Sequence, residues 1–259
     1  MERVTSRDGV RLAVDVIGSG DPVTVVGHGL TGSRHDLAPL APVVPGTSVL
    51  FDFRGHGESD RPAAGSYSMD DFAADVEAVA EAYGATRLVG VSLGGGAGLR
   101  LLSRRPDLFQ RLVLILPARL DPPARRRLLR LAARLEAAEV ADVAARVIAE
   151  EEREGEYGGE LTSRETRRLA LLRMNGDGVP RAIREALADP PVRDHAALAG
   201  VTVPTLVIGQ RGDPVHTAAV ASDLADALPN AELIMYPSRG ALVADIGSLA
   251  ARVAAFLAP

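Results

Sequence analysis

The fold of this 259-residue chain is constrained most strongly by the alternation of short apolar runs with longer helical patterns along the sequence. The strand-like runs cover residues 10–17, 22–26, 48–53, 87–91, 112–116, 203–209 and 232–236. Apolar residues recur at helical spacing over 69–83, 93–104, 218–227 and 246–257. Apolar strands joined by helices predict a mostly parallel sheet that is covered on both faces. The predicted fold class is therefore α/β.

One long segment interrupts this alternation. Between residues 118 and 194 we find no strand pattern, only helical patterns over 124–138, 140–153, 163–174 and 180–188, separated by glycine-rich breaks. We interpret 118–194 as a helical cap inserted over the carboxyl edge of the sheet. Residues 1–117 and 195–259 then form the core, and a single domain is common at this length.

Composition excludes several classes of chemistry. The chain contains no cysteine and no lysine, which excludes disulfides, thiolate catalysis and Schiff-base formation on a lysine. A net charge of -5 does not favour nucleic acid, and no apolar run approaches the roughly 20 residues of a membrane span. No secretory signal is visible, so we expect a cytoplasmic protein. We expect no metal or organic cofactor, and as partner a small-molecule substrate, free or carrier-bound; the sequence leaves the oligomeric state open.

The segment Gly90-Val91-Ser92-Leu93-Gly94 carries the strongest chemical signal. It joins the end of the strand run 87–91 to a helical pattern rich in glycine. Such a strand-to-helix turn can hold a serine in a strained, exposed conformation, with the glycines leaving room for the turn. We therefore predict that Ser92 is a nucleophile.

Two further segments and the loop that carries Asp213 complete a resemblance to the α/β-hydrolase family. The resemblance covers nearly the whole chain. Val25-Val26-Gly27-His28-Gly29-Leu30 resembles the family's His-Gly loop, and Asp52-Phe53-Arg54-Gly55-His56-Gly57-Glu58-Ser59 resembles a second signature. The resemblance implies an α/β-hydrolase fold, with the backbone N–H groups of Leu30 and Leu93 as the oxyanion hole. It also implies that Asp213, on the loop after the run 203–209, is the catalytic acid. We expect the two histidines of these segments, His28 and His56, to be structural.

The catalytic base is missing from its usual place. In the family the histidine follows the last strand, typically directly after a glycine, but the residue after Gly240 is Ala241. No histidine occurs beyond His216. We therefore expect Asp213 and Ser92 to lie on the same side of the sheet edge with a gap between them.

Three other histidines are candidates for the base. His216 lies three residues beyond Asp213, but at the start of the next helix, where the family does not usually place its base. His35 lies in a loop and His195 before a strand, and neither has an evident reason to face the nucleophile. We favour none of the three.

Two functional hypotheses follow. The first is a serine hydrolase or acyltransferase that acts on a small ester, lactone or thioester through an acyl-Ser92 intermediate, impaired because Ala241 replaces the base. The second is a natural family member without the base, which serves as a ligand-binding protein or a biosynthetic cyclase or group-transfer enzyme. In both, aliphatic cap residues within 128–135 and 169–174 are candidates to line the pocket. For most of them we favour the alternative that they pack the cap helices against each other.

Overall fold

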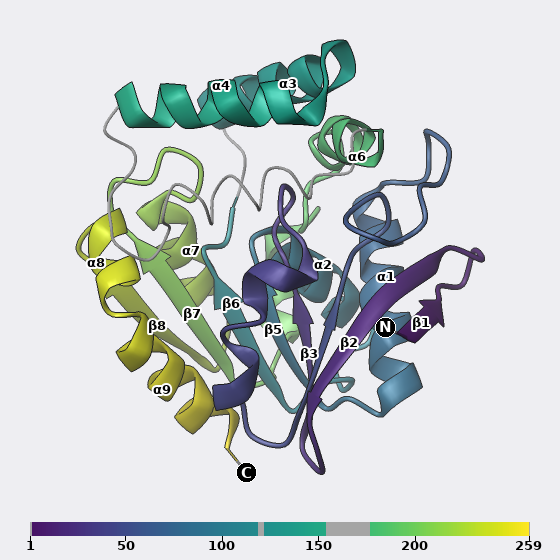
Figure 1. Ribbon diagram of the computed structural model, residues 1–259. Coiled ribbons are helices and arrows are strands. Elements are labelled where there is room, and N and C mark those ends of the chain that lie inside the picture. Colours follow the sequence, from purple (N-terminus) through teal and green to yellow (C-terminus); the bar gives the residue numbers. More distant parts are fainter. Residues whose placement is uncertain (1, 119–121, 154–176, 259) are drawn as a thin grey trace.

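A computed structural model describes residues 2–118, 122–153 and 177–258 of the protein. Its centre is an eight-stranded sheet with the order β1-β2-β4-β3-β5-β6-β7-β8 (Figure 1). The strands from β3 to β8 run parallel, whereas β2 is antiparallel to both of its neighbours. The strands are β1 (Glu2–Thr5), β2 (Arg11–Gly18), β3 (Val23–Gly27), β4 (Thr47–Phe51), β5 (Arg87–Val91), β6 (Arg111–Ile115), β7 (Thr205–Gln210) and β8 (Ala231–Tyr236).

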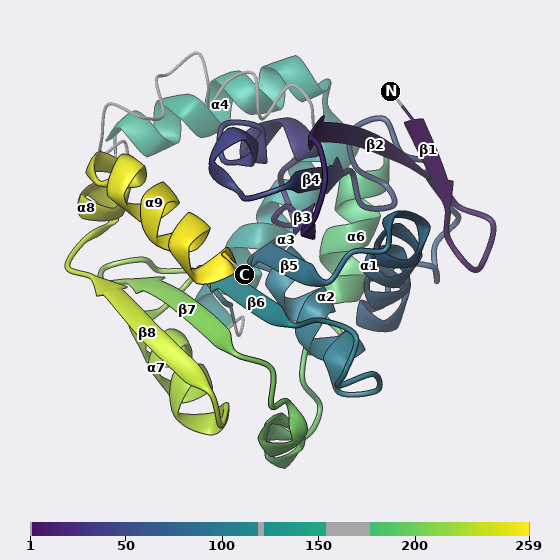
Figure 2. The same cartoon turned by 90° about the horizontal axis from the view of Figure 1, so that it is seen from below.

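Helices cover both faces of this sheet, as Figures 1 and 2 show. One face carries α1 (Met69–Tyr83), α2 (Leu93–Leu102) and α7 (Ala218–Ala227), and the other carries α9 (Ile246–Leu257) with the short 3-10 helices η1 (Arg34–Leu37) and η2 (Ala41–Val43). Neighbouring strand residues belong to opposite layers: Leu88 packs in the apolar cluster of α1 and α2, and Val89 packs in the cluster that contains α9. The central strands are therefore buried on both faces, which explains their continuous apolar runs.

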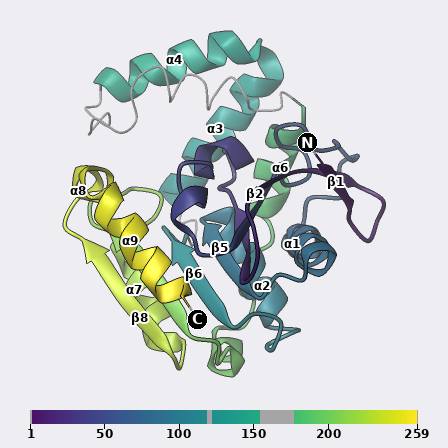
Figure 3. The same ribbon diagram turned by 60° about the horizontal axis from the view of Figure 1, so that its bottom comes forward.

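Between β6 and β7, the described residues include three α-helices that lie over the carboxyl ends of the strands (Figures 1 and 3). They are α3 (Pro122–Ala137), α4 (Val140–Arg153) and α6 (Gly178–Ala186). An ion pair of 2.6 Å between Arg184 and Glu136 joins α6 to α3. A 3-10 helix, η3 (His195–Gly200), then leads back to the core. The helix expected over 163–174 lies outside the described residues.

Several elements have the bounds that the sequence predicts. The helices 69–83, 218–227 and 246–257 and the strand 87–91 agree in both ends. Helix α1 is delimited by a capping box between Ser68 and Asp71 at its start and by Gly84 in the left-handed conformation at its end. The structure adds β1 and helix α8 (Arg239–Ala244), which the sequence patterns did not indicate. Within the described residues, no helix is long and apolar enough to cross a membrane.

Candidate active site

Ser92 lies on a sharp turn between β5 and α2. Its backbone has φ 48° and ψ -103°, a positive φ that is costly for a residue with a side chain. The turn depends on glycine: a Cβ atom on Gly90 would lie 2.3 Å from the Gly95 nitrogen, and one on Gly94 would lie 2.3 Å from the Gly27 carbonyl oxygen. The Ser92 N–H donates to the carbonyl of Ile115 on the neighbouring strand at 2.9 Å. These contacts hold the serine at the carboxyl edge of the sheet in a strained conformation.

The structure places His216 between Ser92 and Asp213. Nε2 of His216 lies 3.1 Å from Oγ of Ser92, and Nδ1 lies 3.1 Å from Oδ2 of Asp213. The sequence led us to expect a gap at this position, because the family's usual histidine is absent. That expectation of a gap is wrong: Ser92 and Asp213 do lie on the same side of the sheet edge, and a histidine joins them.

The turn after β7 explains how a histidine so close to the acid can face it. Oδ1 of Asp213 accepts hydrogen bonds from the backbone N–H groups of Val215 and His216, at 2.8 and 2.9 Å. This Asx-type turn folds the chain back, so that the His216 ring comes to lie beside the other carboxylate oxygen. The Gln210 side chain donates to the same oxygen at 2.7 Å. In the sequence, the signal for this arrangement is the short segment in which Pro214 directly follows Asp213 and His216 lies three residues beyond Asp213.

Hydrogen bonding keeps the Asp213 carboxyl ionised. Burial opposes its charge, since only 7% of the side chain is exposed, against 22% for His216. The His216 ring and the two backbone donors outweigh that penalty and hold the pKa of Asp213 well below its usual range. A carboxylate that stays ionised fixes the Nδ1–H tautomer of His216 and leaves the Nε2 lone pair for Ser92.

Ala241 lies in the first turn of α8 rather than on a loop. Its N–H donates to Oγ of Ser238, the residue that caps this helix, at 3.1 Å. The Ala241 side chain is half-buried against the apolar layer that includes Leu242 and Leu249. Helix α8 therefore occupies the segment in which the resemblance implied a histidine-bearing loop.

Leu30 and Leu93 flank the serine with their backbones. Leu93 is the first residue of α2, where a helix leaves its N–H groups without intrahelical acceptors. Leu30 follows Gly29, which approaches Ser92 so closely that a Cβ on it would lie 3.7 Å from Cβ of Ser92. The carbonyl of Gly29 contacts Nδ1 of His28 at 2.7 Å and accepts from the N–H of Gly32 at 2.9 Å. The peptide that carries the Leu30 N–H is thus held in a fixed orientation.

His28 and His56 are buried and contact backbone groups around this loop. Nε2 of His28 accepts from the N–H of Phe53 at 3.0 Å, while the His56 ring contacts the carbonyls of Leu30 and Arg54 at 2.7 and 2.9 Å. Burial, reinforced by the neighbouring His56, lowers the pKa of His28 to about 3, and burial also lowers the pKa of His56. These contacts connect the loop after β3 to the loop after β4.

A cavity of about 80 Å³ borders Ser92. Its wall comes from α2, from α7, from Pro117 and Ala118 after β6, and from residues between 190 and 195. Residues 128–135 do not line it, which agrees with the alternative that they pack the cap helices; 169–174 lie outside the described residues. In α3, the buried Ala132 and Leu135 pack into the core cluster that also contains Ile183 of α6.

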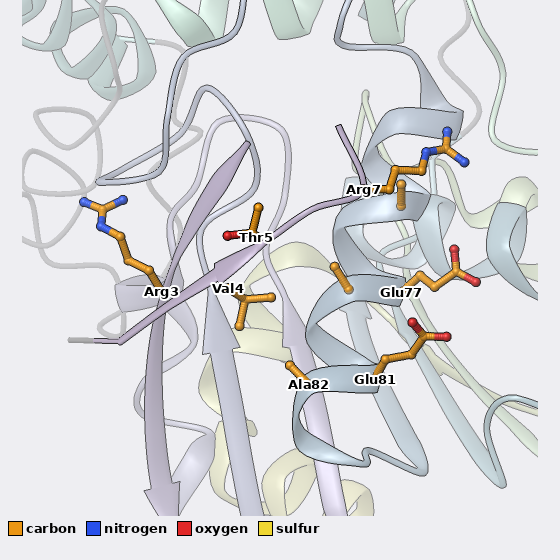
Figure 4. A pocket seen from close by; sticks show the side chains of 9 residues that line it. Arg3, Val4, Thr5, Arg7, Glu77, Glu81 and Ala82 are labelled. Carbon is orange, nitrogen blue, oxygen red and sulfur yellow. The ribbon is translucent and has the colours of Figure 1, made fainter. Parts of the chain in front are cut away.

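A larger cavity, of about 450 Å³, lies between β1 and α1 (Figure 4). Its charged residues include Glu77 and Glu81, both of which pair with Arg105. None of the predicted catalytic residues lines it.

The sequence matches the family model for the alpha/beta hydrolase fold over residues 22–245. The chain belongs to the α/β-hydrolase fold family. This membership confirms the predicted fold class. The family typically presents its nucleophile on a sharp strand-to-helix turn, the nucleophile elbow, and the turn at Ser92 has this form.

Several known proteins of similar sequence or structure are described as hydrolases. A protein of Pseudomonas savastanoi pv. phaseolicola, described as a carbamate hydrolase, RutD, is 28% identical over 222 residues, which cover 83% of this chain and 84% of that protein. A RutD of Caulobacter segnis is 37% identical over 102 residues, but the match spans only 38% of its length. The enol-lactonase of Burkholderia xenovorans has the same fold, with a TM-score of 0.82, 21% identity and 99% of both chains covered.

Proposed function

We propose that this protein is a serine hydrolase in which Ser92 is the nucleophile, His216 the general base and Asp213 the group that orients the base. The observation that carries the proposal is the His216 ring, which lies 3.1 Å from both partners through its two different nitrogens. This is the nucleophile, base and orienting-acid arrangement that activates a serine. It differs from the family's usual pattern in that acid and base come from one turn after β7.

The two nitrogens of His216 would have separate tasks. Nδ1–H donates to Asp213, so the Nε2 lone pair accepts the Ser92 proton as Oγ attacks the substrate carbonyl. The resulting imidazolium passes this proton to the leaving oxygen as its bond to the acyl carbon breaks. Water then attacks acyl-Ser92 with the same histidine as base, and the proton returns to Oγ when the acid is released.

The backbone N–H groups of Leu30 and Leu93 are proposed as the oxyanion hole. Both belong to segments that border Ser92, and neither is used in a turn or loop hydrogen bond between backbone groups of the described residues. Two such donors stabilise the negative charge that develops on the carbonyl oxygen in the tetrahedral intermediate. His28 would support this hole indirectly, because its ring contacts the Gly29 carbonyl of the peptide that presents the Leu30 N–H.

The proposed substrate is a small ester or lactone, and water is the proposed acceptor. The relatives' descriptions as hydrolases support transfer to water over transfer to another acceptor. The alternative of a binding protein without a base rested on Ala241. It loses that support, since His216 lies within hydrogen-bond distance of Ser92.

Acylation of Ser92 tests this function. The wild-type protein and the Ser92→Ala variant would be mixed with p-nitrophenyl acetate, quenched with acid and digested for mass spectrometry. We expect acetyl on the Ser92 peptide, and turnover that disappears in Ser92→Ala. Turnover that persists in Ser92→Ala would refute the proposal. His35→Ala removes an exposed histidine outside the site and is the matched control, with turnover equal to wild type.

A further inference from the structure

The cavity beside Ser92 has a buried apolar end and an exposed mouth. Helices α2 and α7 supply the buried end, which consists of Gly95, Gly96, Leu99, Val220 and Leu224. Its polar side chains other than Ser92 are His195 and Asp223, and both are exposed. A group that enters from Ser92 therefore meets aliphatic walls, which favour a hydrocarbon chain over a charged group.

The position of His216 indicates which half of an ester enters this cavity. The leaving oxygen must reach Nε2 of His216 to receive its proton. Ser92 borders the cavity, but His216 is not among the residues that line it. The half that stays bonded to Ser92, the acyl group, is therefore the part that the cavity can hold.

One wall of the cavity is a strap formed by Pro190, Pro191 and Val192, and a buried arginine fixes it. Nε of Arg100 donates to the Pro191 carbonyl at 3.0 Å, and the same guanidinium binds the Pro190 carbonyl. Arg100 also pairs with Asp189 at 3.0 Å, although only 6% of its side chain is exposed. A planar guanidinium with several donors suits such a cluster of carbonyl and carboxylate oxygens.

The strap is tied to the core at two more points. Asp189 accepts from the N–H of Met69, the first residue of α1, at 3.1 Å. The strap also lies so close to α2 that a Cβ on Gly96 would come within 3.0 Å of Cγ of Pro191. The distance between α2 and the strap, and with it the width of the cavity, is thus set by Arg100 and by tight packing.

We propose that this cavity is the acyl-binding site, that it selects esters of short aliphatic acids, and that Arg100 is a positioning residue that sets its width. The inference rests on the proposed function, because it assumes an acyl-Ser92 intermediate. Leu99 lies on α2, seven residues beyond Ser92, and lines the buried end of the cavity, where it would limit the length of the acyl chain.

The test compares kcat/KM for p-nitrophenyl acetate, butyrate and octanoate. We expect wild type to prefer butyrate to octanoate, and Leu99→Ala to raise the octanoate-to-butyrate ratio about tenfold or more, because one methylene in a tight pocket changes discrimination by about 10-fold to 200-fold. Leu102→Ala is the matched control: Leu102 is buried on the same helix but does not line the cavity. The octanoate-to-butyrate ratio of Leu102→Ala should equal that of wild type.

Val220→Ala widens the cavity on the side of α7 and provides a second test if Leu99→Ala fails to fold. The octanoate-to-butyrate ratio of kcat/KM should rise in this variant as well. Arg100→Met should weaken the preference for butyrate over octanoate in kcat/KM. Arg100→Lys should restore part of this preference. A purely structural role for Arg100 would lower stability with the ratio unchanged. The inference would be overturned if turnover depends on Ser92 but the octanoate-to-butyrate ratio is the same in Leu99→Ala, Val220→Ala and wild type. Turnover that does not depend on Ser92 would instead overturn the proposed function itself.

Discussion

Protonation of His28 is expected to limit the stability of the protein in mild acid. In the folded state Nε2 of His28 accepts from the Phe53 N–H, so a proton on this nitrogen would face another donor. The pKa of His28 is about 3 in the folded protein, against an ordinary value of 6.5. Above pH 6.5 the ring is neutral in both states and contributes nothing to the pH dependence. Below it, the unfolded chain binds a proton that the folded chain does not, so stability falls as the pH decreases towards 3.

The magnitude follows from the two pKa values. Each pH unit between them costs about 1.36 kcal/mol, so the loss between pH 6.5 and pH 5 is about 2 kcal/mol. Urea unfolding at pH 7 and pH 5 would measure it in wild type and in His28→Gln. The variant keeps an acceptor for Phe53 but cannot ionise. It should lose about 2 kcal/mol less than wild type between these pH values, while His35→Gln, at an exposed histidine, should behave like wild type. Equal losses in wild type and His28→Gln would show that protonation of His28 does not cause the loss of stability in acid.

Three more predictions concern the site and its supports. Asp213→Asn should lower kcat by about 10⁴ with the fold intact, because the amide no longer holds the Nδ1–H tautomer of His216; steady-state kinetics and circular dichroism would check this. Gly94→Ala should reduce kcat strongly, since its Cβ would lie 2.3 Å from the Gly27 carbonyl oxygen and displace the elbow; a crystal structure would reveal the shift. Arg54→Met should cost about 3 to 5 kcal/mol of unfolding free energy, because it leaves the fully buried Asp75 without its partner. The double variant Arg54→Met/Asp75→Leu should cost less in the same urea titration.

The fold could be predicted from the sequence because its determinants are local. Helix α1 has a capping box at its start and a glycine in the left-handed conformation at its end, so the pattern and the signals at both ends agree. The elbow could be predicted for the same reason: Gly90 and Gly94 are needed by a turn that spans five residues.

The position of His216 beside Ser92 could not be predicted in this way, because it depends on a turn rather than on a pattern. Two backbone hydrogen bonds to Asp213 bring the His216 ring back beside the carboxylate.

The contacts of Arg100 could not be predicted from the sequence either. In the sequence it is one arginine in an apolar helix, and its carbonyl partners at Pro190 and Pro191 lie about 90 residues away. Contacts of this kind are set by tertiary packing, which the periodicity of a segment does not encode.

We propose that His216, not a residue at position 241, activates Ser92. The most direct test is kcat for p-nitrophenyl acetate in His216→Gln and in Ala241→His, measured beside wild type. We predict that His216→Gln lowers kcat by about 10⁴ to 10⁶ and that Ala241→His gives no increase. A His216→Gln variant that retains wild-type kcat, together with a large gain in Ala241→His, would contradict the claim.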